Sequence, residues 1–188
     1  MPSTDRAPTT GRLRILVDGE RRPDLDAALL EGEVLLPRHG VAGAELRLAI
    51  GGPTSTRPRG GASTASLQDL TLGTAMSVVS GDERLLDAEV TGIEDRYTAG
   101  SPPELVLLAD DALHRMARPA HTRVFDQMSL VDLARHIAGE WGLRAEVDAA
   151  TETGQWVQER ESDLALLLRL ADDRAGGPPR RRRLVARP

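Results

Sequence analysis

Cysteine, lysine and asparagine are absent from this 188-residue sequence, and aromatic residues make up only 2% of it. A chain without Cys forms neither a disulfide nor a thiolate metal site. The scarcity of aromatic side chains nearly excludes a series of exposed rings on which bases or sugars could stack. Apolar residues still reach 40%, so we expect a core built from Leu, Val, Ala and Ile. We attribute the use of Arg in place of Lys to the source genome.

The formal net charge of −5 is unevenly distributed. Six Arg and no acidic residue lie between Arg174 and Pro188, so the first 173 residues carry −11. An acidic body argues against a nucleic-acid-binding protein. The four consecutive Arg from Arg180 to Arg183 could bind phosphates, but they follow a double Pro outside any predicted element. We interpret them as a disordered or off-frame end and expect no nucleic-acid partner.

Long apolar runs are also missing. No stretch approaches the ~20 apolar residues of a membrane-spanning helix. The polar segment from Met1 to Thr10 lacks the apolar region of a signal peptide. We therefore expect no stable membrane insertion and a cytoplasmic chain before any assembly.

The segment from Met128 to Ala175 has the strongest local pattern. Ser129 and Asp132 form a capping box, helical spacing of apolar residues follows, and Gly142 occupies a C-cap position. Ser162 is expected to cap a second helix, which ends at Gly176-Gly177-Pro178. The apolar face predicted for this second helix consists of Leu164, Leu167, Leu168 and Ala171. Strand candidates at 143–147 and 155–158 lie between the helices, which predicts a compact helix-strand-strand-helix α+β unit.

The preceding part of the chain reads as short strands joined by Gly and Pro turns. The predicted strands are 13–17, 31–36, 46–50, 74–79, 86–93 and 104–109. An Asp18-Gly19 turn follows the first strand, a helical turn at 27–30 precedes the second, Ser80-Gly81-Asp82 closes the fourth, and a turn at 97–103 precedes the last. In the strand at 86–93, Ala88, Val90 and Gly92 are expected on one face. This spacing favours an antiparallel barrel or sandwich. The segment from Gly51 to Ser66 has no large apolar side chain and is predicted to be a mobile surface loop.

The resulting fold class is α+β, in four segments. We predict a disordered N-terminus at 1–11 and an antiparallel β-barrel-like domain at 12–118, ending in a short helical or turn segment at 112–116. Pro119 marks the boundary to the α+β unit at 119–176. The last segment, 177–188, is a basic Pro/Arg tail, disordered or off-frame.

Five phrases occur in an order that points to one family. They are Leu72-Gly73-x-x-Met76-x-Val78-x-x-Gly81; Leu85-Leu86-x-Ala88-x-Val90-Thr91-Gly92-Ile93-Glu94; Leu105 to Asp110 with Leu113-x-x-Met116; Met128 to Ala138 with Gly142-Leu143; and Gln158, Ser162-Asp163-Leu164, Leu167 and Leu170-Ala171. Between Leu13 and Ala175 the chain thus resembles the late control protein D family of phages, which includes the VgrG-type spikes of type VI secretion and phage-tail-like particles. Asp82, Leu86 and Ala88 depart from the family pattern at turn or core positions.

The resemblance implies a structural baseplate hub or spike component of a contractile injection system. Complete members form homotrimers whose two barrels per subunit make a pseudo-sixfold ring, adapting a sixfold tube to a threefold spike. The implied partners are the tube protein, baseplate and spike-tip proteins, and effectors, within a phage-tail-like particle or injection apparatus. The strands at 74–79 and 86–94 would line or flank the ring interface, and the 51–66 loop would lie outside it.

The sequence ends where the family continues into its second barrel. We expect the N-terminal part of a hub, shortened by a frame shift or a truncated gene, or else a short variant. The alternatives are a small tail-associated hydrolase, a stand-alone binding module and a non-functional remnant of a hub gene.

No catalytic, cofactor-binding or metal-binding residue is assigned. Nucleophile-elbow, zinc-protease and phosphate-loop motifs are absent. Asp110, Asp111, His114 and His121 have metal-ligand chemistry, but we interpret them as solvated surface residues. His136 is expected to be exposed. Glu159 and Glu161 are interpreted as favourable charges at the start of the second helix.

Overall fold

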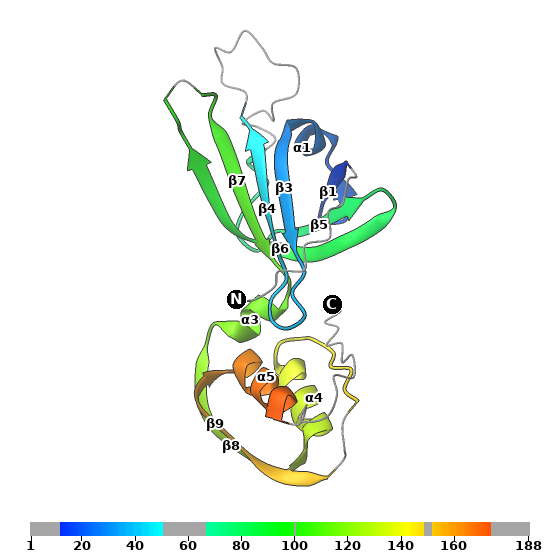
Figure 1. The fold of residues 1–188 in the computed structure, drawn as a ribbon, viewed down its shortest axis with the longest axis vertical. Coiled ribbons are helices and arrows are strands. Elements are labelled where there is room, and N and C mark those ends of the chain that lie inside the picture. The colour runs from blue at the N-terminus through cyan, green and yellow to red at the C-terminus, as the bar shows by residue number, and fades with distance from the viewer. Residues whose placement is uncertain (1–11, 51–66, 100, 149–151, 174–188) are drawn as a thin grey trace. The chain divides into compact units, whose positions relative to one another are not determined.

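The computed structural model describes residues 12–50, 67–99, 101–148 and 152–173 (Figure 1). The chain divides into two compact units between Asp111 and Ala112. The expectations for the N-terminus, the 51–66 loop, the helix stop at Gly176 and the basic tail lie outside the described residues. The division precedes Pro119 because helix α3 (Leu113–Ala117) packs with helix α5 (Asp163–Asp173) of the second unit.

The first unit is a seven-stranded antiparallel sheet with one short helix. Its elements are β1 (Leu13–Val17), β2 (Glu20–Arg21), α1 (Pro23–Ala28), β3 (Leu29–Leu35), β4 (Gly43–Ala49), β5 (Ala75–Ser80), β6 (Glu83–Arg96) and β7 (Glu104–Asp110). The strand order is β2-β1-β5-β6-β7-β4-β3. Each predicted strand of this region is therefore confirmed, with shifted ends, and β6 is longer than expected.

Alternating side chains give this sheet one apolar face. In β4, Ala44, Leu46 and Leu48 are buried, whereas Glu45 between them is exposed. The matching residues of the neighbouring strands, with Leu25 from α1, complete a single apolar core. Burial of this face is the main source of stability of the first unit.

The two ends of the sheet approach each other without pairing. A Cβ atom on Gly32 of β3 would lie 2.6 Å from Cδ1 of Leu13 in β1, so a side chain there would require the end of the Leu13 side chain to move. Beside this approach, the Asp26 carboxylate of α1 accepts a hydrogen bond from the backbone N–H of Ile15 (2.7 Å) and pairs with Arg21. The Leu13 side chain of β1 thus reaches β3, and Asp26 joins α1 to β1 and β2. Within the described residues, no hydrogen-bonded ladder closes the predicted barrel.

A bulge in β6 changes the face on which Gly92 lies. Ala88 and Val90 point into the core, but the pairing register shifts between Val90 and Gly92. One extra residue inverts the alternation of the strand. Gly92 lies beneath Leu108 on the opposite face, so the prediction that it shares the face of Ala88 and Val90 is wrong.

The second unit pairs two long strands and packs two helices on them. After α3 come β8 (Ala120–Ser129), α4 (Leu130–Glu140), β9 (Thr153–Ser162) and α5. Strands β8 and β9 are antiparallel, and Figure 1 shows α4 and α5 on the concave side of this curved ribbon. The order is strand-helix-strand-helix. The predicted helix-strand-strand-helix order is wrong, because β8 was missed and 143–147 forms no strand.

The caps predicted for the two helices are confirmed. The Ser129 hydroxyl accepts the backbone N–H of Asp132 (3.1 Å), and Gly142 has a φ of +68° at the other end of α4. The Ser162 hydroxyl accepts the N–H of Ala165 (3.1 Å) at the start of α5. The predicted face of α5 is partly wrong, because its buried apolar residues are Leu164, Leu166, Leu167 and Leu170. Leu168 is half-buried and Ala171 is exposed.

Candidate functional site

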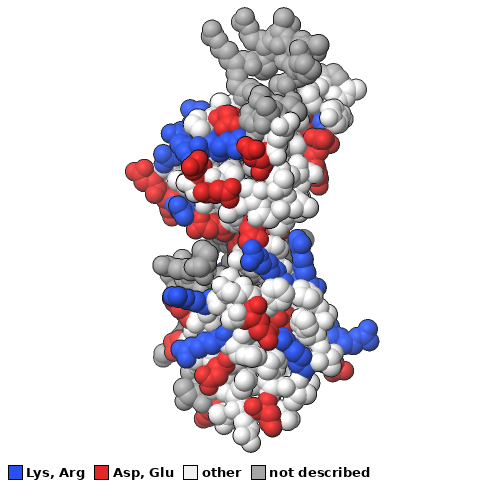
Figure 2. Space-filling model, turned by 180° about the vertical axis from the view of Figure 1, so that it is seen from behind, with Lys and Arg blue, Asp and Glu red and all other residues white. Residues whose placement is uncertain are grey.

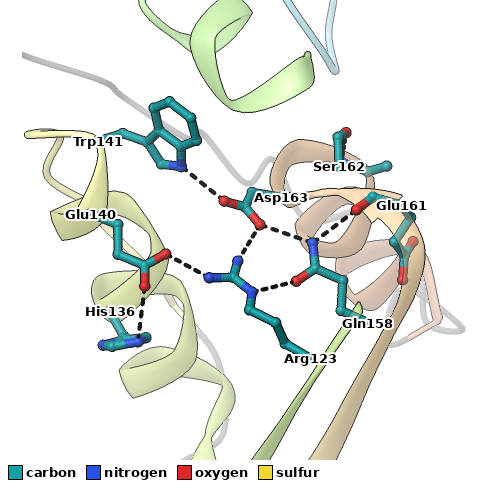
Figure 3. Close-up of polar contacts among 9 residues, drawn as sticks. Arg123, His136, Glu140, Trp141, Gln158, Glu161, Ser162 and Asp163 are labelled. Atoms are coloured by element: carbon teal, nitrogen blue, oxygen red, sulfur yellow. Dashed lines mark hydrogen bonds and ion pairs between the residues drawn. The ribbon is translucent and has the colours of Figure 1, made fainter. Parts of the chain in front are cut away.

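The most organised polar cluster of the described residues surrounds the Asp163 carboxylate (Figure 3). Asp163 is the first residue of α5, and its side chain is 1% exposed. Its oxygens accept hydrogen bonds from Gln158 Nε2 (2.8 Å), from Trp141 Nε1 (2.8 Å) and from the Arg123 guanidinium. We name these four residues, together with Glu140, the Asp163 network.

Arg123 connects the network to every major element of the second unit. From β8 it donates Nε to Gln158 Oε1 of β9 (2.9 Å) and Nη1 to Glu140 Oε2 of α4 (2.8 Å). It also donates to Asp163 of α5, and its guanidinium lies 5.0 Å from the Phe125 ring centroid. One side chain therefore fixes the relative positions of two strands and two helices.

The electrostatics favour the charged forms of both central groups. Burial alone would raise the pKa of Asp163, but the hydrogen bonds from Gln158 and Trp141 and the charge of Arg123 lower it overall. Burial would lower the pKa of Arg123, and the carboxylates of Glu140 and Asp163 raise it instead. Because the Asp163 carboxylate is ionised and already accepts three donors, we assign it a structural role.

The residues considered for a metal site lie in different places. Asp110 accepts a hydrogen bond from the Thr91 hydroxyl (2.8 Å), and Asp111 accepts one from the backbone N–H of Ala42 (3.1 Å). These two Asp belong to the first unit, whereas His114 and His121 belong to the second. Across the described ranges, no three His, Asp or Glu side chains gather as a metal-binding group.

The other titratable residues singled out in the sequence have local partners. His136 is half exposed, and its Nε2 lies 3.4 Å from Glu140 while its ring meets the Phe125 ring edge-on. Glu161 is bound by the Arg169 guanidinium (2.5 Å), so an ion pair with α5 adds to any effect of the helix dipole. Glu159 is exposed on β9.

Sequence reasoning did not find the Asp163 network. Gln158 was noted as the end of a strand candidate and, like Asp163, as part of a resembling phrase, and Arg123 lies in the strand that was missed. An acidic residue in the first turn of a helix normally has a simple dipole explanation, which hid the buried role of Asp163. A useful signal would have been Gln158 flanked by the alternating residues of a strand.

Exposed apolar side chains mark the surfaces available for assembly. Those of the described residues are Leu30, Leu35, Leu36, Leu72, Ile93, Tyr97, Val124 and Val157. Three of them lie on or next to β3, at the edge of the large sheet. Val124 and Val157 are directly opposite each other on β8 and β9. Figure 2 shows Arg side chains next to Asp and Glu side chains on both units.

The predicted ring-interface strands lie in the middle of the first unit. Strand β5 pairs with β1 and β6, and β6 pairs with β5 and β7. The outer face of this pair carries a polar contact in which the Ser77 hydroxyl donates to Asp87 (2.6 Å), and Arg84 pairs with the same carboxylate. No helix of the described residues is long and apolar enough to cross a membrane.

An antiparallel sheet followed by a helix-backed two-stranded ribbon is also found in solved structures of phage tail proteins. No protein-family model and no curated protein matches the sequence. Among solved structures, a 43 kDa tail protein of prophage MuSo2 from Shewanella oneidensis matches with a TM-score of 0.67 and 15% identity, covering 88% of this chain and 49% of that one. A tail protein from Neisseria meningitidis MC58 matches with a TM-score of 0.54 and 15% identity, covering 86% and 44%.

A third similar structure comes from a secretion system. The E. coli c3393 protein matches with a TM-score of 0.54 and 10% identity, covering 83% of this chain and 42% of its own. It is a component of the type VI secretion system with structural similarity to the T4 tail proteins gp27 and gp5. The chain spans less than half the length of these structures. The resemblance to tail and hub proteins is confirmed at the level of the fold.

Proposed function

We propose that this chain is a structural component of a phage-tail-like or type VI-like injection apparatus, acting as the N-terminal part of a baseplate hub. The observation that carries the proposal is the match of 88% of the chain, across both units, to a prophage tail protein. The similar structures are tail or secretion components, which favours a structural over an enzymatic role. No buried side-chain polar atom of the described Asp163 network lacks a hydrogen-bond partner, which is typical of a structural element.

Assembly is proposed to occur through a trimeric ring that joins a tube to a spike. The likeness in fold to tail proteins and the exposed apolar side chains support this proposal. In it, β5 and β6 are the strands that line or flank the contact between subunits. The tube protein, baseplate proteins, spike-tip proteins and effectors are the proposed partners. In this proposal, function arises from matching shape and symmetry between rings.

The test measures the mass of the complex formed with the tube protein of the same system. Analytical ultracentrifugation of the chain mixed with that tube protein should give a complex containing three copies of the chain. Ala75→Arg places a charge on the exposed side of β5 and should reduce trimer formation, whereas Ala120→Arg at the exposed start of β8 should not. A chain that stays monomeric and binds no tube protein would contradict the proposal.

A further inference from the structure

The two-stranded ribbon of the second unit has open strand edges. Within the described residues, no third strand joins β8 and β9. The helices lie on the concave side of the ribbon (Figure 1). Val124 and Val157 are opposite each other across the strands, with exposed fractions of 61% and 51%. An open edge beside exposed β-branched side chains is a place where another strand can add.

One side chain of α5 lies against this part of β9. Arg169 Nη2 donates a hydrogen bond to the backbone carbonyl of Val157 (3.0 Å). The same guanidinium binds the Glu161 carboxylate, with Nη2 donating to Oε1 (2.5 Å) and Nε to Oε2 (3.3 Å). Helix α5 contacts β9, whereas helix α4 contacts β8. Arg169 therefore approaches the carbonyl from the β9 side of the ribbon, where a further strand would add.

The sequence of β9 is compatible with antiparallel pairing to a second copy of itself. In a register centred on Val157, the Val157 side chains of the two copies are opposite each other. Glu159 is the only charged residue between 155 and 159, and Gln155 of the second copy is opposite it. No like charges therefore face each other in this register, which is the arrangement that opposes strand pairing least. Val124 and Val157 of both copies would form one apolar row across four strands.

We propose that Arg169 guards the edge of β9 against antiparallel pairing with β9 of a second copy of this chain. The guanidinium occupies a backbone acceptor at the centre of the self-compatible register, and Glu161 holds it there. Arg169 is exposed, so an incoming strand has to displace this side chain but not the helix. The inference is independent of the proposed ring assembly, because β5 and β6 belong to the other unit.

Arg169→Met tests the guard directly. It removes the guanidinium donors and leaves an unbranched apolar side chain on α5. Sedimentation equilibrium should give a dimer Kd at least about tenfold lower for this variant than for the native chain. The matched control is Arg135→Met, the same change at an exposed residue of α4, which should leave the Kd unchanged. Native-like tryptophan fluorescence should accompany the dimer, which distinguishes it from association of unfolded chains.

Glu161→Gln provides a second, milder variant. It keeps the guanidinium but removes the charge that holds it, so the Kd should fall in the same direction by a smaller factor. This variant tests the guard without removing Arg169, and it remains informative where Arg169→Met lowers the stability of the second unit.

Substitutions at Val157 locate the contact. Val157→Lys added to Arg169→Met places like charges at the centre of the pair and should restore the native Kd. Leu72→Lys, at a 67% exposed position of the first unit, should leave the Arg169→Met dimer intact. The chain has no Cys, so Val157→Cys introduces a single thiol. A short bis-maleimide should cross-link two such copies faster when they also carry Arg169→Met.

Three results would overturn the inference. The first is a dimer Kd that neither Arg169→Met nor Glu161→Gln lowers. The second is an Arg169→Met dimer that Val157→Lys does not disrupt, because another surface would then hold it. The third is equally fast cross-linking of Val157→Cys with and without Arg169→Met, which would show that the edge is open in the native chain.

Discussion

The two units hold their elements together by different means. In the first unit, seven strands share one apolar core, and Leu46, Leu48 and Leu107 have no exposed surface. In the second unit, two strands and two helices also share apolar contacts, but Arg123 and Asp163 connect all four elements through hydrogen bonds. A wide sheet can enclose side chains on its own face, whereas a two-stranded ribbon needs helices held against it. Directional bonds provide that alignment.

The largest effect that tests this difference is expected from Asp163→Ala. The change leaves the donors of Arg123, Gln158 and Trp141 without their common acceptor in a buried place, so we expect a loss of ~3–5 kcal/mol in the free energy of unfolding. Urea denaturation followed by tryptophan fluorescence measures it in the second unit, which contains both Trp residues. Asp172→Ala, on the exposed end of α5, is the control and should cost less than ~0.5 kcal/mol. A loss below ~1 kcal/mol for Asp163→Ala would show that the network is dispensable.

The corresponding change in the first unit is Leu107→Ala. Leu107 lies in β7 with an exposed fraction of 0%, and truncation should cost ~2–5 kcal/mol through lost burial and a residual cavity. Hydrogen exchange should quicken in β4, β6 and β7. Leu72→Ala, at a 67% exposed position, should leave these amides protected. Unchanged exchange in Leu107→Ala would contradict the idea that the core holds this sheet together.

Acid should affect the second unit through Asp163. Its pKa is lowered in the folded chain, so the unfolded chain binds the proton more tightly. The stabilisation is therefore present above the ordinary carboxyl pKa of 3.8 and is lost as pH falls through the lower folded value. Urea midpoints by tryptophan fluorescence between about pH 6 and pH 2 should fall more steeply in the native chain than in Asp163→Asn. Equal slopes would assign the acid sensitivity to other carboxylates.

The smallest expected effect is a gain in stability from Arg160→Gly. Arg160 has a φ of 49°, which costs an L-residue energy that glycine avoids. Its backbone N–H would still donate to the Thr122 hydroxyl (3.2 Å). We expect ~0.5–1 kcal/mol of stabilisation by thermal unfolding. Arg160→Ala keeps the positive φ and should show no such gain, and a stabilised Ala variant would point to removal of the charge instead.

Local sequence patterns predicted much of the fold because they describe interactions between near neighbours. Ser129 and Gly142 bounded α4 correctly, since caps act within one turn. Alternation identified the strands of the first unit. Strand β8 was missed because a bulge between Phe125 and Met128 breaks its alternation. The strand expected at 143–147 has alternation but no partner to pair with in the described chain.

The sequence by itself determined the main strands of the first unit, the caps of both main helices and the acidic character of the body, because these depend on composition and short spacing. Only the tertiary structure decided which strand lies at the edge, which face Gly92 occupies and how Asp163 is bound. These features depend on residues distant in the sequence, such as Arg123 and Asp163 or Leu13 and Gly32. Their contacts form only when the strands pair and the helices pack, so no local pattern specifies them.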